Sequence, residues 1–267
     1  MSLSFLYSTC SIQIHQIFKI SKFHTKLSGM ADWDDSVTKG PDTCTLKCPK
    51  AAGKRKSPID ISPNHACEVM LPELQTKYNT EKIKQKLQNV GYCWKVVTEG
   101  KYNDLALWGG PLQEQHELKY QGEIHFVHIN NRYCSVDKAL RHSDGLCVLG
   151  VFFNLGCKAN PEIAKIIDVM NKCEAKGAEA KLERNVDISQ IIPFSGSYYT
   201  YSGSLTTPPC SECTTWIVFE DPIQISQDQL DAFNSLKDGT GKIITNNFRP
   251  LMPLEGREVR LVRNSNH

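Results

Sequence analysis

The sequence predicts a single α+β domain, mainly β, built on one central sheet with a few peripheral helices. Three observations favour this class: several short runs rich in β-branched and aromatic residues, one long helical pattern, and no regular alternation of strands with helices. A length of 267 residues allows one large domain or two small ones. With 40% hydrophobic residues, the chain can bury a sizeable core.

The strand predictions come from four runs that are short and bounded by Gly, Pro, Asn or Asp. Such runs are typical of strands, because branched and aromatic side chains pack well on a pleated surface. We expect strands at 92–97, 124–129, 147–153 and 215–219.

Two helices are expected on the sheet. Between Pro161 and Lys181, Pro161 is a start signal and apolar residues then recur at helical spacing, at Ile163, Ile166, Ile167 and Met170. This pattern predicts one amphipathic helix. A second, shorter helix is expected at 227–236.

Residues 1–29 differ from the rest of the chain. Lysines occur at Lys19, Lys22 and Lys26, and no acidic residue precedes Asp32. A basic, acid-poor segment is typical of organelle targeting, which would direct the domain at 30–267 to the mitochondrion. The alternative is an unstructured extension ahead of a second possible start at Met30, in a cytoplasmic protein.

Charge and apolar runs exclude two classes of partner. The 31 basic and 29 acidic residues are spread along the chain, so no strong field of one sign favours nucleic acid. No apolar run is long enough to span a bilayer. We therefore expect neither nucleic-acid binding nor a membrane span.

The eleven cysteines are odd in number and scattered, which favours a reducing compartment. Cys44, Cys48, Cys210 and Cys213 could together form a four-thiolate zinc site, or each could have a separate packing role. Whether Cys210 pairs with Cys44 or with Cys48 is also left open.

Specific motifs follow one another between Ala31 and Val262. They are Trp33, Gly40-Pro41-Asp42, Lys56-Ser57-Pro58-Ile59-Asp60-Ile61, Asn89-Val90-Gly91-Tyr92, Gly109-Gly110-Pro111-Leu112, Glu123-Ile124-His125-Phe126-Val127-His128, Asp144-Gly145-Leu146-Cys147-Val148-Leu149-Gly150, the run from Tyr198 to Pro209, and Asn246-Asn247-Phe248-Arg249-Pro250. In content and order they resemble the α-class carbonic anhydrases. The resemblance implies one domain around a twisted, mostly antiparallel sheet with a conical zinc pocket. It also implies a zinc lyase that reversibly hydrates carbon dioxide to bicarbonate.

That reaction requires a zinc ion to lower the pKa of a bound water to near neutrality, so that hydroxide can attack carbon dioxide. The family holds the zinc with three imidazoles: two from a strand reading His-x-His-Trp-Gly, and one from the Glu-aliphatic-His of the next strand. By this resemblance His125 is the third ligand. Glu123 resembles the carboxylate that supports a ligand without touching the metal.

The first two ligands have no counterpart in this sequence. One alignment places Leu105 and Leu107 at the metal, and leucine cannot bind zinc. The other aligns 107–112 with an earlier family stretch, and the ligand strand is then absent between Leu118 and Gly122. Both alignments lose two of the three histidines, and the second predicts a sheet with one central strand missing.

Two nearby histidines are weak substitutes. His128 lies three residues from His125 in an expected strand, so it points to the opposite face, where a core histidine is expected. His116 is close in sequence but has no ligand spacing around it.

Other residues resemble the family's pocket. Thr206 resembles the hydroxyl that accepts a hydrogen bond from zinc-bound hydroxide, and Thr207 is its neighbour in the pocket. Tyr92 stands where efficient members carry a proton-shuttling histidine, and a phenol with a pKa near 10 is a poor shuttle at pH 7. The apolar wall for carbon dioxide corresponds to Val127, Val148, Leu205 and Trp216.

Three functional hypotheses follow. The first is a carbonic anhydrase homologue in which catalysis is impaired, because one imidazole cannot hold a catalytic zinc. The second is a non-catalytic, carbonic-anhydrase-related module that binds an unidentified protein partner. The third is a chain that cannot fold stably, because loss of a central strand leaves two new sheet edges.

Overall fold

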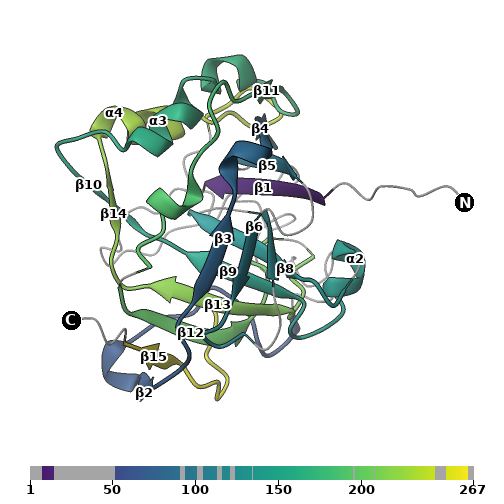
Figure 1. Ribbon diagram of the computed structural model, residues 1–267, viewed down its shortest axis with the longest axis vertical. Helices are drawn as coiled ribbons and strands as arrows, with labels where there is room; N and C mark the ends of the chain where they lie inside the picture. The colour runs from purple at the N-terminus through teal and green to yellow at the C-terminus, as the bar shows by residue number, and fades with distance from the viewer. Residues whose placement is uncertain are drawn as a thin grey trace, which may run out of the picture.

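One large sheet organises the chain. The computed structural model describes residues 8–14, 52–90, 94–100, 105–112, 116–120, 124–133, 135–194, 196–207, 209–243 and 251–263. The strands run across the sheet in the order β11-β4-β5-β1-β8-β9-β13-β12-β15-β2, and a branch β3-β6-β7 joins at β8 (Figure 1). Strands β10 and β14 pair separately.

The strands of the described ranges are β1 (Ser8–Ile14), β2 (Cys67–Val69), β3 (Gln75–Tyr78), β4 (Lys84–Asn89), β5 (Trp94–Gly100), β6 (Leu105–Trp108), β7 (His116–Tyr120), β8 (His125–Asn130), β9 (Leu146–Gly150), β10 (Phe153–Leu155), β11 (Glu179–Lys181), β12 (Tyr198–Gly203), β13 (Thr214–Phe219), β14 (Ile223–Ile225) and β15 (Arg260–Val262). The α-helices there are α2 (Val136–Ala139), α3 (Pro161–Ile167) and α4 (Gln227–Phe233). Most neighbouring strands are antiparallel, whereas β9–β13, β2–β15 and β10–β14 are parallel. The predicted class, mainly β with a few helices and a mostly antiparallel sheet, is confirmed.

The strand predictions agree with the structure at their centres. The expected run at 124–129 is β8, the run at 215–219 is β13, and the described part of 92–97 lies in β5. The run at 147–153 is divided, because β9 ends at Gly150 and β10 begins at Phe153.

The prediction of one long helix at 161–181 is wrong. Helix α3 ends at Ile167, and the 3₁₀ helix η4 (Met170–Cys173) follows, because the backbone leaves α geometry at Val169, with φ −115° and ψ 0°. Gly177 then turns the chain at φ +85°, and β11 pairs with β4. A strand pairing therefore replaces the expected last turns. The helix expected at 227–236 is α4, which ends at Phe233.

The two faces of the sheet carry separate cores. The helix-side core, named here for helices α3 and α4, contains Ile163 and Phe233, with Phe126 from β8. The opposite core contains Val127 and Ile129, with Ala139 of α2. Because side chains alternate along a strand, β8 supplies both cores. None of the helices in the described ranges combines the length and apolar composition needed to cross a membrane.

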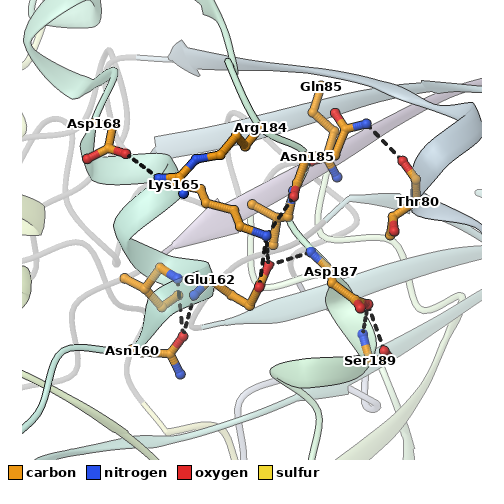
Figure 2. Close-up of polar contacts among 12 residues, drawn as sticks. Thr80, Gln85, Asn160, Glu162, Lys165, Asp168, Arg184, Asn185, Asp187 and Ser189 are labelled. Atoms are coloured by element: carbon orange, nitrogen blue, oxygen red, sulfur yellow. Dashed lines mark hydrogen bonds and ion pairs between the residues drawn. The ribbon is translucent and has the colours of Figure 1, made fainter.

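A polar network joins helix α3 to β4 (Figure 2). Buried Glu162 accepts hydrogen bonds from Lys165 Nζ at 2.7 Å and from the N–H of Asp187 at 2.6 Å. Asn185 Nδ2 donates to the carbonyl of Ile83, just before β4, at 2.8 Å. The N–H of Val186 donates to Gln85 Oε1 in β4, also at 2.6 Å. This network fixes the outer part of the sheet to the helix.

The position of β1 changes the expectation of a missing strand. All of Ser8–Ile14 pairs antiparallel with β5, and Gln13 also pairs with His125 of β8 (Figure 1). The sheet is therefore continuous between β5 and β8. A segment that the sequence predicted as an extension or targeting signal lies in the centre of the sheet.

Candidate functional site

The expected apolar wall gathers on one face of the sheet. Val127 of β8 is in register with Val148 of β9, and Val148 is in register with Trp216 of β13. Residues in register on neighbouring strands lie on the same face of a sheet. Leu205 packs against this opposite core. The structure thus brings these four residues together, while their role in binding carbon dioxide remains a prediction.

His125 lies on the same face of the sheet, because it is two residues from Val127 along β8. It is in register with Gly150, and Gly150 is in register with Val218. The imidazole is 5% exposed and lies edge-on to the Trp216 ring, with centroids 4.7 Å apart. The expected metal ligand is therefore a buried residue that packs against an indole.

The loop that carries the two threonines is fixed by reciprocal hydrogen bonds with Ser57. The N–H of Ser57 donates to Ser204 Oγ at 3.0 Å, and the N–H of Ser204 donates to Ser57 Oγ at 3.1 Å. Trp216 Nε1 donates to the carbonyl of Ser204 at 3.0 Å. A Cβ at Gly203 would overlap Ser57 Oγ, so only glycine permits this close approach.

A buried cation fixes the other end of this loop. Lys56 is 2% exposed, and its Nζ donates to the carbonyl of Cys210 at 3.0 Å and lies 3.2 Å from Glu212 Oε1. The N–H of Arg55 donates to the same carboxylate at 2.8 Å. Burial favours the neutral acid, but these donors outweigh it and lower the pKa of Glu212.

Thr206 and Thr207 lie between these two fixed points and are half-buried. The N–H of Cys210 donates to the carbonyl of Thr207 at 2.9 Å, and the N–H of Leu205 donates to the carbonyl of Ser211 at 3.0 Å. The loop is thus ordered by its own backbone as well as by its neighbours. Ser57, Lys56 and Glu212 were not predicted as site residues, although Lys56 and Ser57 stand in one of the quoted motifs.

His128 is a core residue, as its spacing predicted. It is 0% exposed, its Nδ1 lies 3.1 Å from the carbonyl oxygen of Phe126, and its Nε2 lies 3.1 Å from the Tyr78 hydroxyl. A carbonyl can only accept, so Nδ1 is the donor, and in the neutral ring Nε2 accepts from Tyr78. Both ring nitrogens have partners on the helix-side face.

His116 is distant from His125 along the sheet. It is in register with Asn130 at the far end of β8. Five residues of strand correspond to roughly 17 Å. The backbone therefore places the two histidines too far apart to share one metal ion.

The two leucines of the first alignment also do not lie at His125. Strand β6 pairs with β3 and β7, not with β8, and Leu107 belongs to the helix-side core. Strand β6 thus does not stand beside His125, where the first alignment would place it, and the absence of the ligand strand between Leu118 and Gly122 stays a prediction.

The described side chains near His125 do not form a zinc site. Among the residues that the structure describes, no three His, Cys, Asp or Glu side chains are close enough to bind one metal. The imidazole packs against the indole of Trp216, which is not a zinc ligand. Glu123 and Tyr92 lie outside the described residues, as do Cys44 and Cys48, so their predicted roles stay predictions.

Comparison with known proteins agrees with the motifs. A family model described as eukaryotic-type carbonic anhydrase matches residues 39–119 and 115–263. Carbonic anhydrase 1 of Mus musculus is 35% identical over 258 residues, which cover 86% of this chain and 98% of that protein. Carbonic anhydrase 3 of Bos taurus is 31% identical over 256 residues, which cover 86% of this chain and 97% of that protein.

The family match is in two stretches, and they meet at 115–119, which overlaps β7. The break falls beside the position at which the sequence predicted the loss of the ligand strand. Both stretches together still extend over most of the chain. The sheet, the ordered motifs and these relatives agree that the chain belongs to the eukaryotic-type carbonic anhydrase family.

Proposed function

We propose that this chain is a carbonic anhydrase homologue whose hydration of carbon dioxide is lost or strongly impaired. The observation that carries the proposal is the identity of the strand next to His125. Strand β7 pairs with β8 as far as Tyr120, which is opposite Val127. The next residue paired with that edge of β8 is Gln13 of β1, opposite His125. The place where the family's ligand strand would continue is taken by a segment without histidine.

The chemical consequence follows from the number of imidazoles. Zinc is held in such sites by three protein ligands and keeps a fourth position for water. Binding free energy and the pKa of the bound water both depend on that ligand set. Among the residues that the structure describes, His125 supplies the one imidazole at this position. We therefore expect that zinc is not retained and that no hydroxide forms near neutral pH.

The remaining pocket residues support a scaffold rather than an active site. Val127, Val148 and Trp216 are each less than 5% exposed, so they pack as core. The loop with Thr206 keeps its bonded framework through Ser57 and Lys56. A non-catalytic binding module is the alternative function, and it requires the same loss of zinc chemistry.

Zinc content tests this proposal directly. The purified full chain and a His125→Ala variant would be dialysed against zinc and then against buffer, and the bound metal measured by mass spectrometry. Because thiolates also bind zinc, only metal that disappears with His125 counts. We expect equal zinc in both proteins. A zinc ion that is retained by the chain and lost in His125→Ala would contradict the proposal.

A second readout excludes a folding artefact. Cobalt(II) bound by three imidazoles and water gives visible absorption without the intense thiolate bands near the ultraviolet. The absence of that spectrum in the full chain, with a cooperative unfolding transition intact, supports the proposal. Its presence would overturn it.

A further inference from the structure

We propose that the segment Ser8–Ile14 is an integral strand of the folded domain, which complements the sheet where the ligand strand is missing. The segment fills the gap from within the same chain. This goes beyond the proposed function, because it assigns a structural role to a part of the sequence that resembles a removable signal.

The pairing is extensive along β5. Every residue of β1 has an antiparallel partner there, from Ser8 opposite Gly100 to Ile14 opposite Trp94. Within the described ranges, β5 pairs with β4 along its other edge. Without β1 the inner edge of β5 would expose a row of unpaired N–H and C=O groups in the middle of the sheet.

One edge of β8 also needs β1 as a pairing partner. One edge of β8 pairs with β9, and the other is shared between β7, up to Val127, and β1, at His125. Since β7 ends at Tyr120, it does not reach the level of His125. Strand β1 therefore joins β5 to β8 beyond the end of β7.

The sequence of the segment agrees with this register. Ile12 is opposite Val96 and Ile14 is opposite Trp94, and both partners are at most 2% exposed. The intervening Gln13 is opposite half-buried Lys95. A slip by one residue in one direction would place Ile14 opposite half-buried Lys95 instead of buried Trp94, so the observed register gives both isoleucines a buried apolar partner.

The strand closes the sheet without restoring the metal site. Its sequence, STCSIQI, contains no histidine, aspartate or glutamate, and Gln13 is the residue opposite His125. The one thiol, Cys10, is three residues along the strand from Gln13, opposite Thr98 of β5. Complementation and loss of zinc binding are therefore compatible. In contrast, complementation is not compatible with removal of residues 1–29 as a targeting signal, because the cut would delete β1.

Hydrogen exchange on the full chain tests the proposal. Proline lacks an N–H and disrupts a central strand, so Ile12→Pro should release β1, while Ser4→Pro, which lies outside the strand, is the matched control. We expect amides of β5 to exchange at least about tenfold faster in Ile12→Pro, with amides of β13 unchanged. Equal β5 exchange in Ile12→Pro and Ser4→Pro would overturn the proposal.

A truncated chain that starts at Met30 gives a second test. It should show weaker β5 protection than the full chain, and a synthetic peptide of residues 6–16 should restore it, whereas a peptide of the same composition in scrambled order should not. Undiminished protection in the truncated chain would overturn the proposal. If the full chain is a dimer whose β5 protection falls on dilution, the strand comes from a second copy, and the intramolecular proposal is also overturned.

These readouts are independent of catalysis. Exchange in β5 reports the presence of β1 whether or not the protein hydrates carbon dioxide. Zinc binding that depends on His125 would refute the proposed function but not this inference. Rapid exchange of the β5 amides in the full chain would refute this inference but not the proposed function.

Discussion

The imidazole of His125 meets the indole of Trp216 edge-on, with ring centroids 4.7 Å apart and planes inclined at 77°. This geometry is a favourable packing of two rings. Trp216 also donates from Nε1 to the carbonyl of Ser204, so it joins the expected ligand to the loop that carries Thr206. The pair belongs to the core of the folded scaffold.

Replacing Trp216 by phenylalanine should destabilise the protein. The variant loses the hydrogen bond to Ser204 and leaves a buried carbonyl without that donor, which costs about 1–3 kcal/mol. Trp108→Phe is the control, because Trp108 is 38% exposed and its loss should change stability by less than about 0.5 kcal/mol. Urea unfolding measures both. Equal urea midpoints for Trp216→Phe and Trp108→Phe would show that the Trp216 contacts do not stabilise this face of the sheet.

Restoring a ligand strand should create a metal site. Insertion of x-His-x-His-Trp-Gly after Tyr120, with x apolar, would extend β7 along β8 past Val127 and displace Gln13 of β1. In this register the first inserted histidine is opposite His125 and the second lies on the same face. We expect the insertion variant to retain one zinc ion that the parent chain does not, because three imidazoles then converge. The same insertion with His125→Ala is the control and should lose that zinc. If both insertion variants bind equally, His125 is not positioned as a ligand.

Glu212 should contribute stability that depends on pH. Burial raises the pKa of Glu212, but the hydrogen bonds and charges of Arg55 and Lys56 outweigh it and hold the folded pKa below the ordinary value of a glutamate. A carboxylate with a lowered pKa stabilises the fold above its unfolded pKa, and this contribution is lost as the pH falls through the folded value. Glu212→Gln should therefore cost about 1 kcal/mol at pH 7 and converge with the parent chain in acid.

Urea unfolding at pH 7 and near pH 3 measures this difference. Glu258→Gln is the control, because Glu258 is 54% exposed where it pairs with Arg260, and exposed pairs contribute little. A difference between Glu212→Gln and the parent that is the same at both pH values would contradict the assignment.

The network of Figure 2 should respond to the loss of one charge. Glu162→Gln removes the partner of Lys165 and weakens the bond from the Asp187 N–H. Because these groups are largely buried, we expect destabilisation by about 2–3 kcal/mol. Glu183→Gln breaks an exposed pair with Lys172 and should cost less than about 0.5 kcal/mol. Equal losses of thermal stability in Glu162→Gln and Glu183→Gln would argue against a structural role of the network.

Much of the fold could be predicted because it depends on local patterns. Alternation and branched residues identify β8 and β13, and their register then brings Val127 and Trp216 onto one face. The end of α3 could not be predicted from apolar spacing alone, since the pairing of β11 with β4 is a contact between distant segments.

The central role of β1 was also beyond the sequence patterns. Ile12 and Ile14 alternate with polar residues, but the basic, acid-poor surroundings favoured a signal or an extension. Only the structure shows an edge of β5 that requires a partner. Similarly, Lys56 and Ser57 were visible as motif residues, whereas their bonds to the loop at 204–213 connect parts of the chain that are far apart.

The rate of carbon dioxide hydration tests the central claim most directly. The purified full chain would be assayed by stopped flow with zinc supplied, and again with a chelator added. The account predicts a rate equal to that of buffer in both cases, because His125 lacks the two further imidazoles of the family. A chelator-sensitive rate above background, lost in His125→Ala, would contradict it.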